Sequence, residues 1–255
     1  NTETARLSHL VDPLPVIAAG VSGEFRVQSL DEFGNVYPTW CADVDEQGNL
    51  INAEHIKCQG CSASFDGTIS AGAAVGAFVC VGNGLYDSSF SSSTAGVYDL
   101  FITEDDLQLQ GSPFAATVVP AATAADHCIA VGAGLTAATA GEWASFKVTA
   151  YDRFDNARGV GGDVFNLDLV GDGVVDFNVQ DNEDGTYDIS YRVELAGEYA
   201  LSVRIGTAAV PVGIPGIVTV SPAGVDAEKS TVEGSGLTNA VAGAPSYFTI
   251  IARDE

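Results

Sequence analysis

Two five-residue segments of this chain are almost identical: GAGLT at residues 132–136 and GSGLT at residues 234–238. They lie 102 positions apart (234 − 132). The same spacing relates three further pairs of residues: Gly141 and Gly243, Phe146 and Phe248, and Asp152 and Asp254. Matches at one fixed spacing indicate repeated structural units of a single kind.

An earlier copy of the pattern lies near the N-terminus. At a spacing of 121, five of its residues match the later copy: Gly20, Phe25, Asp31, Phe33 and Asn35. Further along, GLY at 84–86 and AGVY at 95–98 match GTY at 185–187 and AGEY at 196–199, now at a spacing of 101. The difference of 20 residues (121 − 101) indicates an insertion between Asn35 and Gly84. We therefore predict a repeat with a cysteine-bearing insertion over residues 1–120, a plain repeat over 121–222, and the first strands of a third, truncated repeat over 223–255.

The second repeat shows its secondary structure in the spacing of its apolar residues. Apolar and polar residues alternate in FKVTA at 146–150 and in YDISYRV at 187–193, as they do in strands with one buried face. Turn-forming Gly, Asp and Asn separate such runs. We expect seven strands, around 129–133, 143–151, 163–170, 174–180, 186–194, 198–205 and 216–221. Seven short strands in about 100 residues are typical of an antiparallel immunoglobulin-like β-sandwich, so the predicted fold class is all-β.

The order of the landmarks in the second repeat resembles the filamin-type immunoglobulin repeat. The landmarks are GAGL at 132–135, FKV at 146–148, DRFDN at 152–156, GG at 161–162, DGTY at 184–187, AGEY at 196–199 and VTV at 218–220. The first repeat adds GSPF at 111–114, a motif typical of the family, but has GLY in place of DGTY. The second repeat has GIP at 213–215 in place of Gly-Ser-Pro.

The resemblance implies non-enzymatic spacers and docking modules. Some filamin repeats bind peptides by adding a strand to an exposed sheet edge, where backbone groups are unpaired. In this chain such an edge is expected near residues 163–180. The resemblance does not carry actin binding over, because these 255 residues hold no actin-binding domain.

The charge balance excludes several classes of partner. The chain has 34 Asp and Glu against 10 Lys and Arg, a formal net charge of −24. Binding to nucleic acid or to an anionic membrane surface requires a basic face, which this composition cannot supply. No run approaches the ~20 apolar residues of a membrane helix, so no direct membrane insertion is expected in this segment. Cations and cationic partners remain compatible with the charge.

Four of the five cysteines lie in or beside the insertion: Cys41, Cys58, Cys61 and Cys80. Disulfides are a common means of holding a segment that has no core of its own, and we expect them here. Four cysteines allow three connectivities, which the sequence does not separate. A zinc site is less favoured, because only one Cys-x-x-Cys pair is present, and reduced buried thiols are the other alternative. Cys128, at the start of the second repeat, would remain unpaired or bond elsewhere.

The acidic turns raise the possibility of calcium binding. The candidate ligands are Asp43 and Asp45 in the first repeat and Asp181 and Asp184 in the second; the segment 103–106 is also dense in oxygen-bearing side chains. Calcium takes six to eight oxygen ligands, but no complete EF-hand loop is present. We expect solvated turns in which Asp and Asn bond to nearby backbone groups, and no cofactor other than this possible calcium.

Nothing in the sequence indicates catalysis. The three histidines, His9, His55 and His127, occupy unrelated repeat positions, and no nucleophile elbow, phosphate loop or zinc-protease motif occurs. His127 next to Cys128 is interpreted as a linker residue, and Trp143 as a strand residue that is partly in the core.

The sequence therefore predicts a structural or adhesive module of a large extracellular or cell-surface protein with many repeats, with a filament or appendage as one candidate setting. Its expected partners are proteins, either neighbouring repeats or copies in an assembly, and not nucleic acid. One alternative is an intracellular cytoskeletal or ciliary scaffold that binds peptides by strand addition. A lower alternative is a carbohydrate-binding region of a secreted enzyme.

Overall fold

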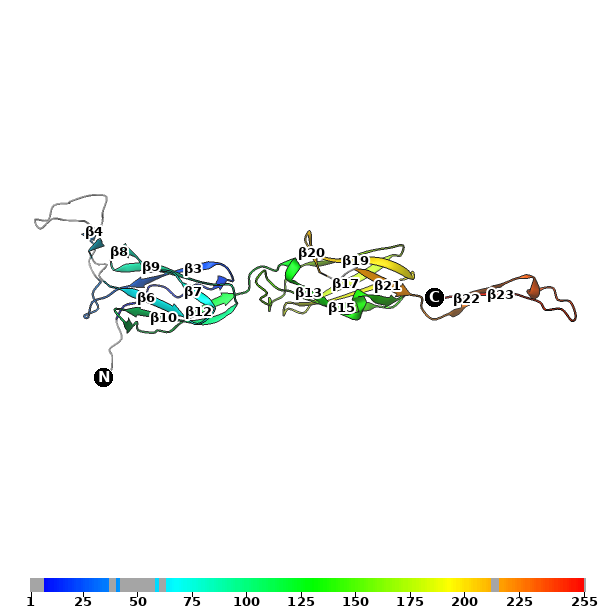
Figure 1. The fold of residues 1–255 in the computed structure, drawn as a ribbon, viewed down its shortest axis with the longest axis horizontal. Coiled ribbons are helices and arrows are strands. Elements are labelled where there is room, and N and C mark those ends of the chain that lie inside the picture. The colour runs from blue at the N-terminus through cyan, green and yellow to red at the C-terminus, as the bar shows by residue number, and fades with distance from the viewer. Residues whose placement is uncertain (1–6, 37–39, 42–57, 60–62, 212–215, 255) are drawn as a thin grey trace, which may run out of the picture. The chain divides into compact units, whose positions relative to one another are not determined.

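The computed structural model describes residues 7–36, 40–41, 58–59, 63–211 and 216–254. The chain divides into two compact units, Asn1–Ala121 and Ala122–Glu255, and both are built from β-strands (Figure 1). The helices in the described ranges are three 3-10 turns: η1 (Ala125–His127), η2 (Ala133–Leu135) and η3 (Ser235–Leu237). No helix in this part of the chain is long and apolar enough to cross a membrane. The predicted all-β, immunoglobulin-like fold class is confirmed.

The first unit contains two main sheets. One has the order β1 (His9–Leu10), β3 (Ser22–Gln28), β9 (Leu85–Ser92) and β7 (Ala73–Val75), and β8 (Val79–Gly82) also pairs with β9. The other has the order β11 (Leu107–Gln108), β10 (Gly96–Glu104), β12 (Phe114–Val119) and β2 (Ile17–Ala18), and β6 (Phe65–Ile69) also pairs with β10. A separate ladder joins β4 (Trp40–Cys41) to β5 (Cys58–Gln59).

The second unit repeats this arrangement. Its first sheet has the order β13 (Ile129–Val131), β15 (Ala144–Thr149), β18 (Thr186–Val193) and β17 (Val175–Asp181). Its second sheet has the order β14 (Ala137–Thr139), β21 (Ile217–Ser221), β19 (Gly197–Ile205) and β16 (Phe165–Val170), and β20 (Ala208–Val210) also pairs with β19. The pairing of β14 with β21 is parallel, and the other pairings of these sheets are antiparallel. All seven predicted strands of this repeat are present. The two that the prediction missed, β14 and β20, are each three residues long.

The core of the second repeat lies between its two sheets. Tyr187, Ile189 and Tyr191 from β18 face Tyr199 and Val203 from β19, and each is at most 1% exposed. Full burial of one large apolar side chain contributes roughly 1.5–3 kcal/mol. Alternation along β18 places the intervening residues on the outer face, so the period of two in the sequence sets which side chains form this core.

Two glycines explain why the GAGLT segment recurs. Gly132 has a φ of +147°, and a Cβ built on it would lie 2.6 Å from the Cα of Phe146. A Cβ on Gly134 would lie 2.7 Å from the backbone oxygen of Ser145. The segment crosses β15 too closely for any side chain, which makes glycine necessary at both positions.

The last part of the chain forms an antiparallel hairpin of β22 (Asp226–Glu233) and β23 (Thr249–Arg253). Its 3-10 turn η3 holds the second copy of the motif, GSGLT. A Cβ on Gly234 would lie 2.9 Å from the Cα of Phe248, which is the same close approach that Gly132 makes to Phe146. The hairpin therefore repeats the local geometry of the second repeat.

Candidate functional site

The cysteine candidates fall largely outside the described residues. The described backbone places Cys41 opposite Cys58 as partners in the β4–β5 ladder, and Cys80 lies in β8, opposite Tyr86. Cys61 lies outside the described residues, as do the side chains of Cys41 and Cys58. Disulfide pairing among the four stays a prediction.

Cys128 is a free thiol, 3% exposed. Its Sγ donates a hydrogen bond of 3.3 Å to the carbonyl oxygen of Ala124, and burial raises the pKa of the thiol. The adjacent His127 instead forms an ion pair, 2.7 Å long, between its Nδ1 and Oδ1 of Asp155. The side chains of His127 and Cys128 are adjacent in sequence but have separate partners, so they do not form a Cys–His pair.

The second-repeat calcium candidates accept hydrogen bonds from nearby backbone nitrogens and a hydroxyl group. Asp181 accepts from the backbone nitrogens of Gly162 (2.7 Å) and Glu183 (2.8 Å). Asp184 accepts from the nitrogen (2.9 Å) and the hydroxyl (2.6 Å) of Thr186, and these bonds lower the pKa of its carboxyl group. Asp43 and Asp45 lie outside the described residues. Calcium binding by these four residues stays a prediction; in the described ranges no three His, Cys, Asp or Glu side chains are grouped to hold a metal.

The acidic segment 103–106 has a structural role at Glu104. This residue is 3% exposed, and its two carboxylate oxygens accept hydrogen bonds from the hydroxyls of Ser8 (2.6 Å) and Ser29 (2.5 Å). The Ser8 hydroxyl accepts in turn from the backbone nitrogen of Leu30. A buried carboxylate needs such partners, and here they join the N-terminal segment to β10. Sequence reasoning could not find this network, because its members are up to 96 residues apart.

Trp143 differs from its prediction. It precedes β15 and is 55% exposed, so it is not a core residue. The guanidinium carbon of Arg192 lies 5.5 Å from its ring centroid, a distance typical of a cation–π contact. Alternation along β15 places Phe146 and Val148 in the core, so Trp143, three residues before Phe146, falls on the opposite, outer side.

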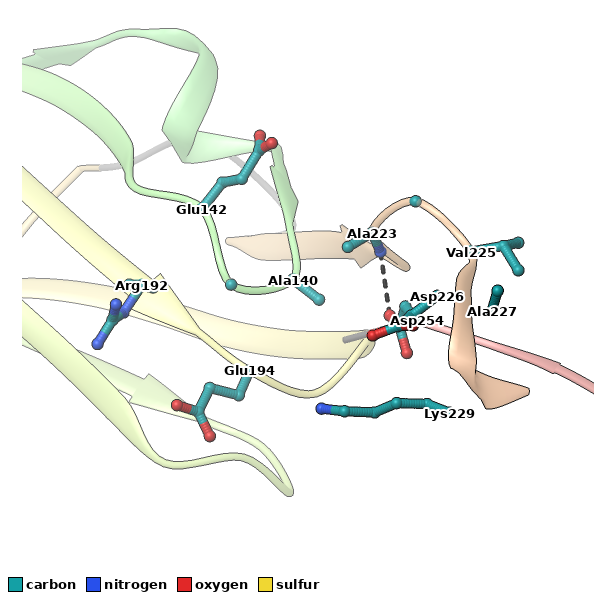
Figure 2. Close-up of a pocket in the computed structure, with 12 residues that line it drawn as sticks. Ala140, Glu142, Arg192, Glu194, Ala223, Val225, Asp226, Ala227, Lys229 and Asp254 are labelled. Atoms are coloured by element: carbon teal, nitrogen blue, oxygen red, sulfur yellow. Dashed lines mark hydrogen bonds between the residues drawn. The ribbon is translucent and has the colours of Figure 1, made fainter. Parts of the chain in front are cut away.

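A charged pocket lies where the end of the second repeat meets the β22–β23 hairpin (Figure 2). Four acidic and two basic side chains line it: Glu142, Glu194, Asp226, Asp254, Arg192 and Lys229. The Asp254 carboxylate accepts a hydrogen bond of 3.0 Å from the Ala223 nitrogen, and the Lys229 side chain extends toward the side on which Glu194 lies (Figure 2). The pocket therefore holds charges of both signs.

The edge predicted near 163–180 consists of β16 and β17. Within the described residues β16 pairs only with β19, and β17 only with β18, so each strand has an edge without a backbone partner. Apolar side chains are exposed along both strands and their flanking loops: Val164 (71%), Val170 (70%), Val174 (79%) and Phe177 (48%). Exposed strand edges are sites of strand addition, so this edge is the candidate functional site.

The arginines nearest this edge form salt bridges with aspartates, which neutralise their positive charge. Arg204 on β19 bridges to Asp168 on β16 over 3.0 Å, and Arg192 on β18 bridges to Asp176 on β17 over 2.8 Å. Both bridges are solvent-exposed and contribute at most about 1 kcal/mol. They nevertheless occupy the two arginines of the neighbouring strands.

These features define a class of protein: tandem immunoglobulin-like sandwiches with exposed sheet edges. A family model described as "Filamin/ABP280 repeat" matches residues 122–213. Filamin-A of Drosophila melanogaster is 32% identical over 171 residues, which are 67% of this chain and 7% of that protein. The chain is therefore composed of filamin-type repeats and belongs to the filamin-repeat family; it spans only a small part of the length of its curated relatives.

Two solved structures share the fold. The Escherichia coli adhesin FdeC has a TM-score of 0.58 at 19% identity, covering 98% of this chain and 74% of that one. Invasin, a bacterial integrin-binding protein, has a TM-score of 0.55 at 13% identity, covering 89% of this chain and 40% of that one. At such identities the similarity concerns the fold alone.

Proposed function

We propose that this chain is a non-enzymatic structural or adhesive segment of a large extracellular or cell-surface protein with many repeats, in a filament or appendage. The observation that supports this most is the core of the second repeat, which is closed between two sheets of its own. A module with its own core resists extension independently of its neighbours, as a spacer must.

The proposed location rests on composition. Four cysteines concentrate in and around one insertion, a pattern expected where disulfides persist, outside the reducing cytosol. The net charge of −24 keeps an array of such repeats hydrated and apart from one another.

Single-molecule force spectroscopy on the chain tests this function. The second repeat should unfold in one event that releases about 30 nm of chain, since each residue extends by ~3.3–3.6 Å. If disulfides close the insertion, the event of the first repeat should be shorter and should lengthen on addition of reductant. Gradual extension without a discrete event for the second repeat would contradict the spacer function. An unchanged first event in reductant would contradict the oxidised, extracellular form.

A second candidate function is the docking of a partner peptide by strand addition, which would also suit an intracellular scaffold. The observation that favours it is the pair of strand edges on β16 and β17 that have no backbone partner among the described residues, with their exposed apolar side chains. Amide hydrogen exchange of β16, measured with and without a partner peptide, tests this directly. It is more direct than a proline substitution at Asn166, which would reduce peptide binding only if the N–H of this residue faces the added strand. Slower exchange in β16 on addition of a partner would support docking, and unchanged exchange at saturating partner would contradict it.

A further inference from the structure

The strand registers show which positions of the two repeats are equivalent. In the first repeat Gly67 of β6 pairs with Ile102 of β10; in the second, Leu167 of β16 pairs with Val203 of β19. Since Ile102 and Val203 match at the repeat spacing of 101, Gly67 and Leu167 hold the same place. The position of a buried leucine in one repeat is thus a glycine in the other.

The neighbouring strand differs by one residue. In the first repeat Val75 pairs with Phe90 and Cys80 with Tyr86. In the second, Phe177 pairs with Tyr191 and Asp181 with Tyr187. The partner strand advances four residues in both cases, whereas the first-repeat strand advances five (80 − 75) and the second-repeat strand four (181 − 177). The extra residue is a bulge, which separates β7 from β8 and re-aims a side chain.

The re-aimed side chain is Phe78. Its ring centroid lies 5.8 Å from that of Phe25 and 5.6 Å from that of Phe65. A Cβ on Gly67 would lie 3.1 Å from the Phe78 ring and 2.8 Å from Cγ1 of Val75. Phe78 and Val75 therefore cover β6 at the position where the second repeat has its own leucine, and β7 lies close against β6.

The second repeat has no such cover in its described residues. Val175 and Val179 of β17 pack against the core, and Phe177, which shares their face, is 48% exposed. Its first-repeat equivalent Val75 is partly buried. At two further positions, Val164 and Val170, the second repeat exposes apolar side chains where the first, 100 residues earlier, has Ser64 and Ser70.

The two edges also differ in their number of charged residues. Residues 163–181 contain five aspartates and no Lys or Arg, whereas the equivalent residues 63–80 contain one aspartate and no Lys or Arg. Asp168 and Asp176 already hold Arg204 and Arg192, and Asp172 is exposed in the loop between β16 and β17. An extended segment beside β16 would place one face next to Phe177 and the other level with the outer face of β16, which carries Asp168, and near the loop that carries Asp172.

We propose that the two repeats differ in docking: the edge of the second repeat accepts an extended segment with alternating apolar and basic side chains, and the edge of the first is closed by Phe78. This inference rests on the strand-addition function proposed above. Apolar partner residues pack on Phe177, and Lys or Arg residues on the opposite face meet the aspartate-rich surface.

Three nine-residue peptides test the proposal on the whole chain: Val alternating with Lys, with Thr or with Glu. Binding is followed by backbone amide shifts in NMR. The Val–Lys peptide should shift amides of β16 and β17, bind at least about tenfold more tightly than the Val–Thr peptide at low salt, and lose most of that advantage in 0.5 M salt. The Val–Glu peptide should not bind. The double variant Asp168→Asn/Asp172→Asn should remove the preference for lysine, and Asp66→Asn in the first repeat is the matched control that should leave it unchanged.

The outcomes separate the inference from the function on which it rests. Equal binding of all three peptides at β16 and β17 would overturn the charge preference and leave strand addition standing. Shifts in β6 and β7 comparable to those in β16 and β17 would overturn the closure by Phe78. Absence of binding by every peptide would overturn both the preference and strand addition at this edge.

Discussion

The hydroxyl group of Tyr191 donates a hydrogen bond of 2.5 Å to the carbonyl oxygen of Gly134. Tyr191 is fully buried in β18, and Gly134 is buried in η2. The bond joins the GAGLT segment to the core by a side chain, while the missing side chain at Gly134 lets that segment lie against Ser145 of β15. The motif that reveals the repeats is thus held in place from both sides.

Replacing Tyr191 with phenylalanine should destabilise the second repeat by about 1–3 kcal/mol, because the buried carbonyl of Gly134 loses its donor. The free energy of unfolding, measured by urea denaturation with circular dichroism, checks this. The matched control is Tyr247→Phe, at a tyrosine that is 77% exposed, and it should leave the midpoint unchanged. Equal midpoints for both variants would show that the Tyr191 bond contributes nothing.

The same tyrosine makes the repeat sensitive to alkali. Burial raises the pKa of Tyr191 to about 12, above the value of ~10 for an unfolded tyrosine. Its contribution to stability is therefore complete below pH 10 and is lost as the pH rises from 10 through about 12. Stability curves of the wild type and of Tyr191→Phe should converge over this interval, and parallel curves would contradict the assignment.

Asp152, in the turn after β15, should contribute more to stability than its first-repeat equivalent Asp31, in the turn after β3. Asp152 is 0% exposed and accepts from the nitrogens of Phe154 (2.8 Å) and Asn156 (3.0 Å). Asp31 accepts the same bonds in an exposed turn. Asp152→Ala should cost about 2 kcal/mol through the loss of buried, charge-assisted bonds, and Asp31→Ala should cost less. Amide hydrogen exchange in each turn measures both variants; a larger effect at Asp31 would contradict the burial argument.

Asp31 also predicts a sign for acid sensitivity. Its hydrogen bonds with Asn35, first the side-chain bond and then the backbone bond, lower the pKa of its carboxyl group. The contribution of Asp31 is present above the ordinary value of ~3.9 and is lost as the pH falls through the lowered value. In Asn35→Ala the carboxyl pKa, followed by NMR, should rise toward the ordinary value. An unchanged pKa would mean that the Asn35 side chain does not hold the carboxylate.

The sequence predicted the fold wherever periodicity and spacing carry the information. The alternation in β18 predicted its buried face, and the spacings of 102 and 101 predicted equivalent strands. The sequence did not predict β14, because three residues are too few to show an alternating pattern. Its parallel partner, β21, also begins 80 positions downstream (217 − 137). The sequence did not predict the bulge at Phe78 either. A one-residue insertion cannot be told from ordinary variation in loop length until the pairing register of the strands is known.

The candidate site was predicted only in outline. The edge near 163–180 was expected from the resemblance to filamin repeats, but the exposure of Val170 and Phe177 depends on how the two sheets pack. The sequence suggested Asp181 as a calcium ligand because its turn is rich in oxygen-bearing side chains. The sequence alone does not show which hydrogen-bond donors the Asp181 carboxylate accepts from. In the structure one of those donors, the nitrogen of Gly162, lies 19 residues away along the chain.

His127 should titrate above its ordinary pKa. The hydrogen bond and charge of Asp155 raise the pKa of the imidazole, so the ion pair contributes below the unfolded value of ~6.5 and is lost as the pH rises through the raised one. An NMR titration of the imidazole in the wild type and in Asp155→Asn checks this. The variant should titrate lower, and identical curves would show that Asp155 does not act on His127.

Thiol counting tests both the disulfides and the proposed location. Protein purified without reductant should show no reactive thiol while folded, because Cys128 is buried and its pKa is raised. In denaturant, mass spectrometry should show one alkylated cysteine without reductant and five with it, out of the five in the chain. The variant Cys128→Ala should reduce these numbers to zero and four, which identifies the single free thiol. Five alkylated cysteines in the wild type without reductant would overturn the extracellular proposal and favour the intracellular scaffold, since the insertion would then be held without a covalent link.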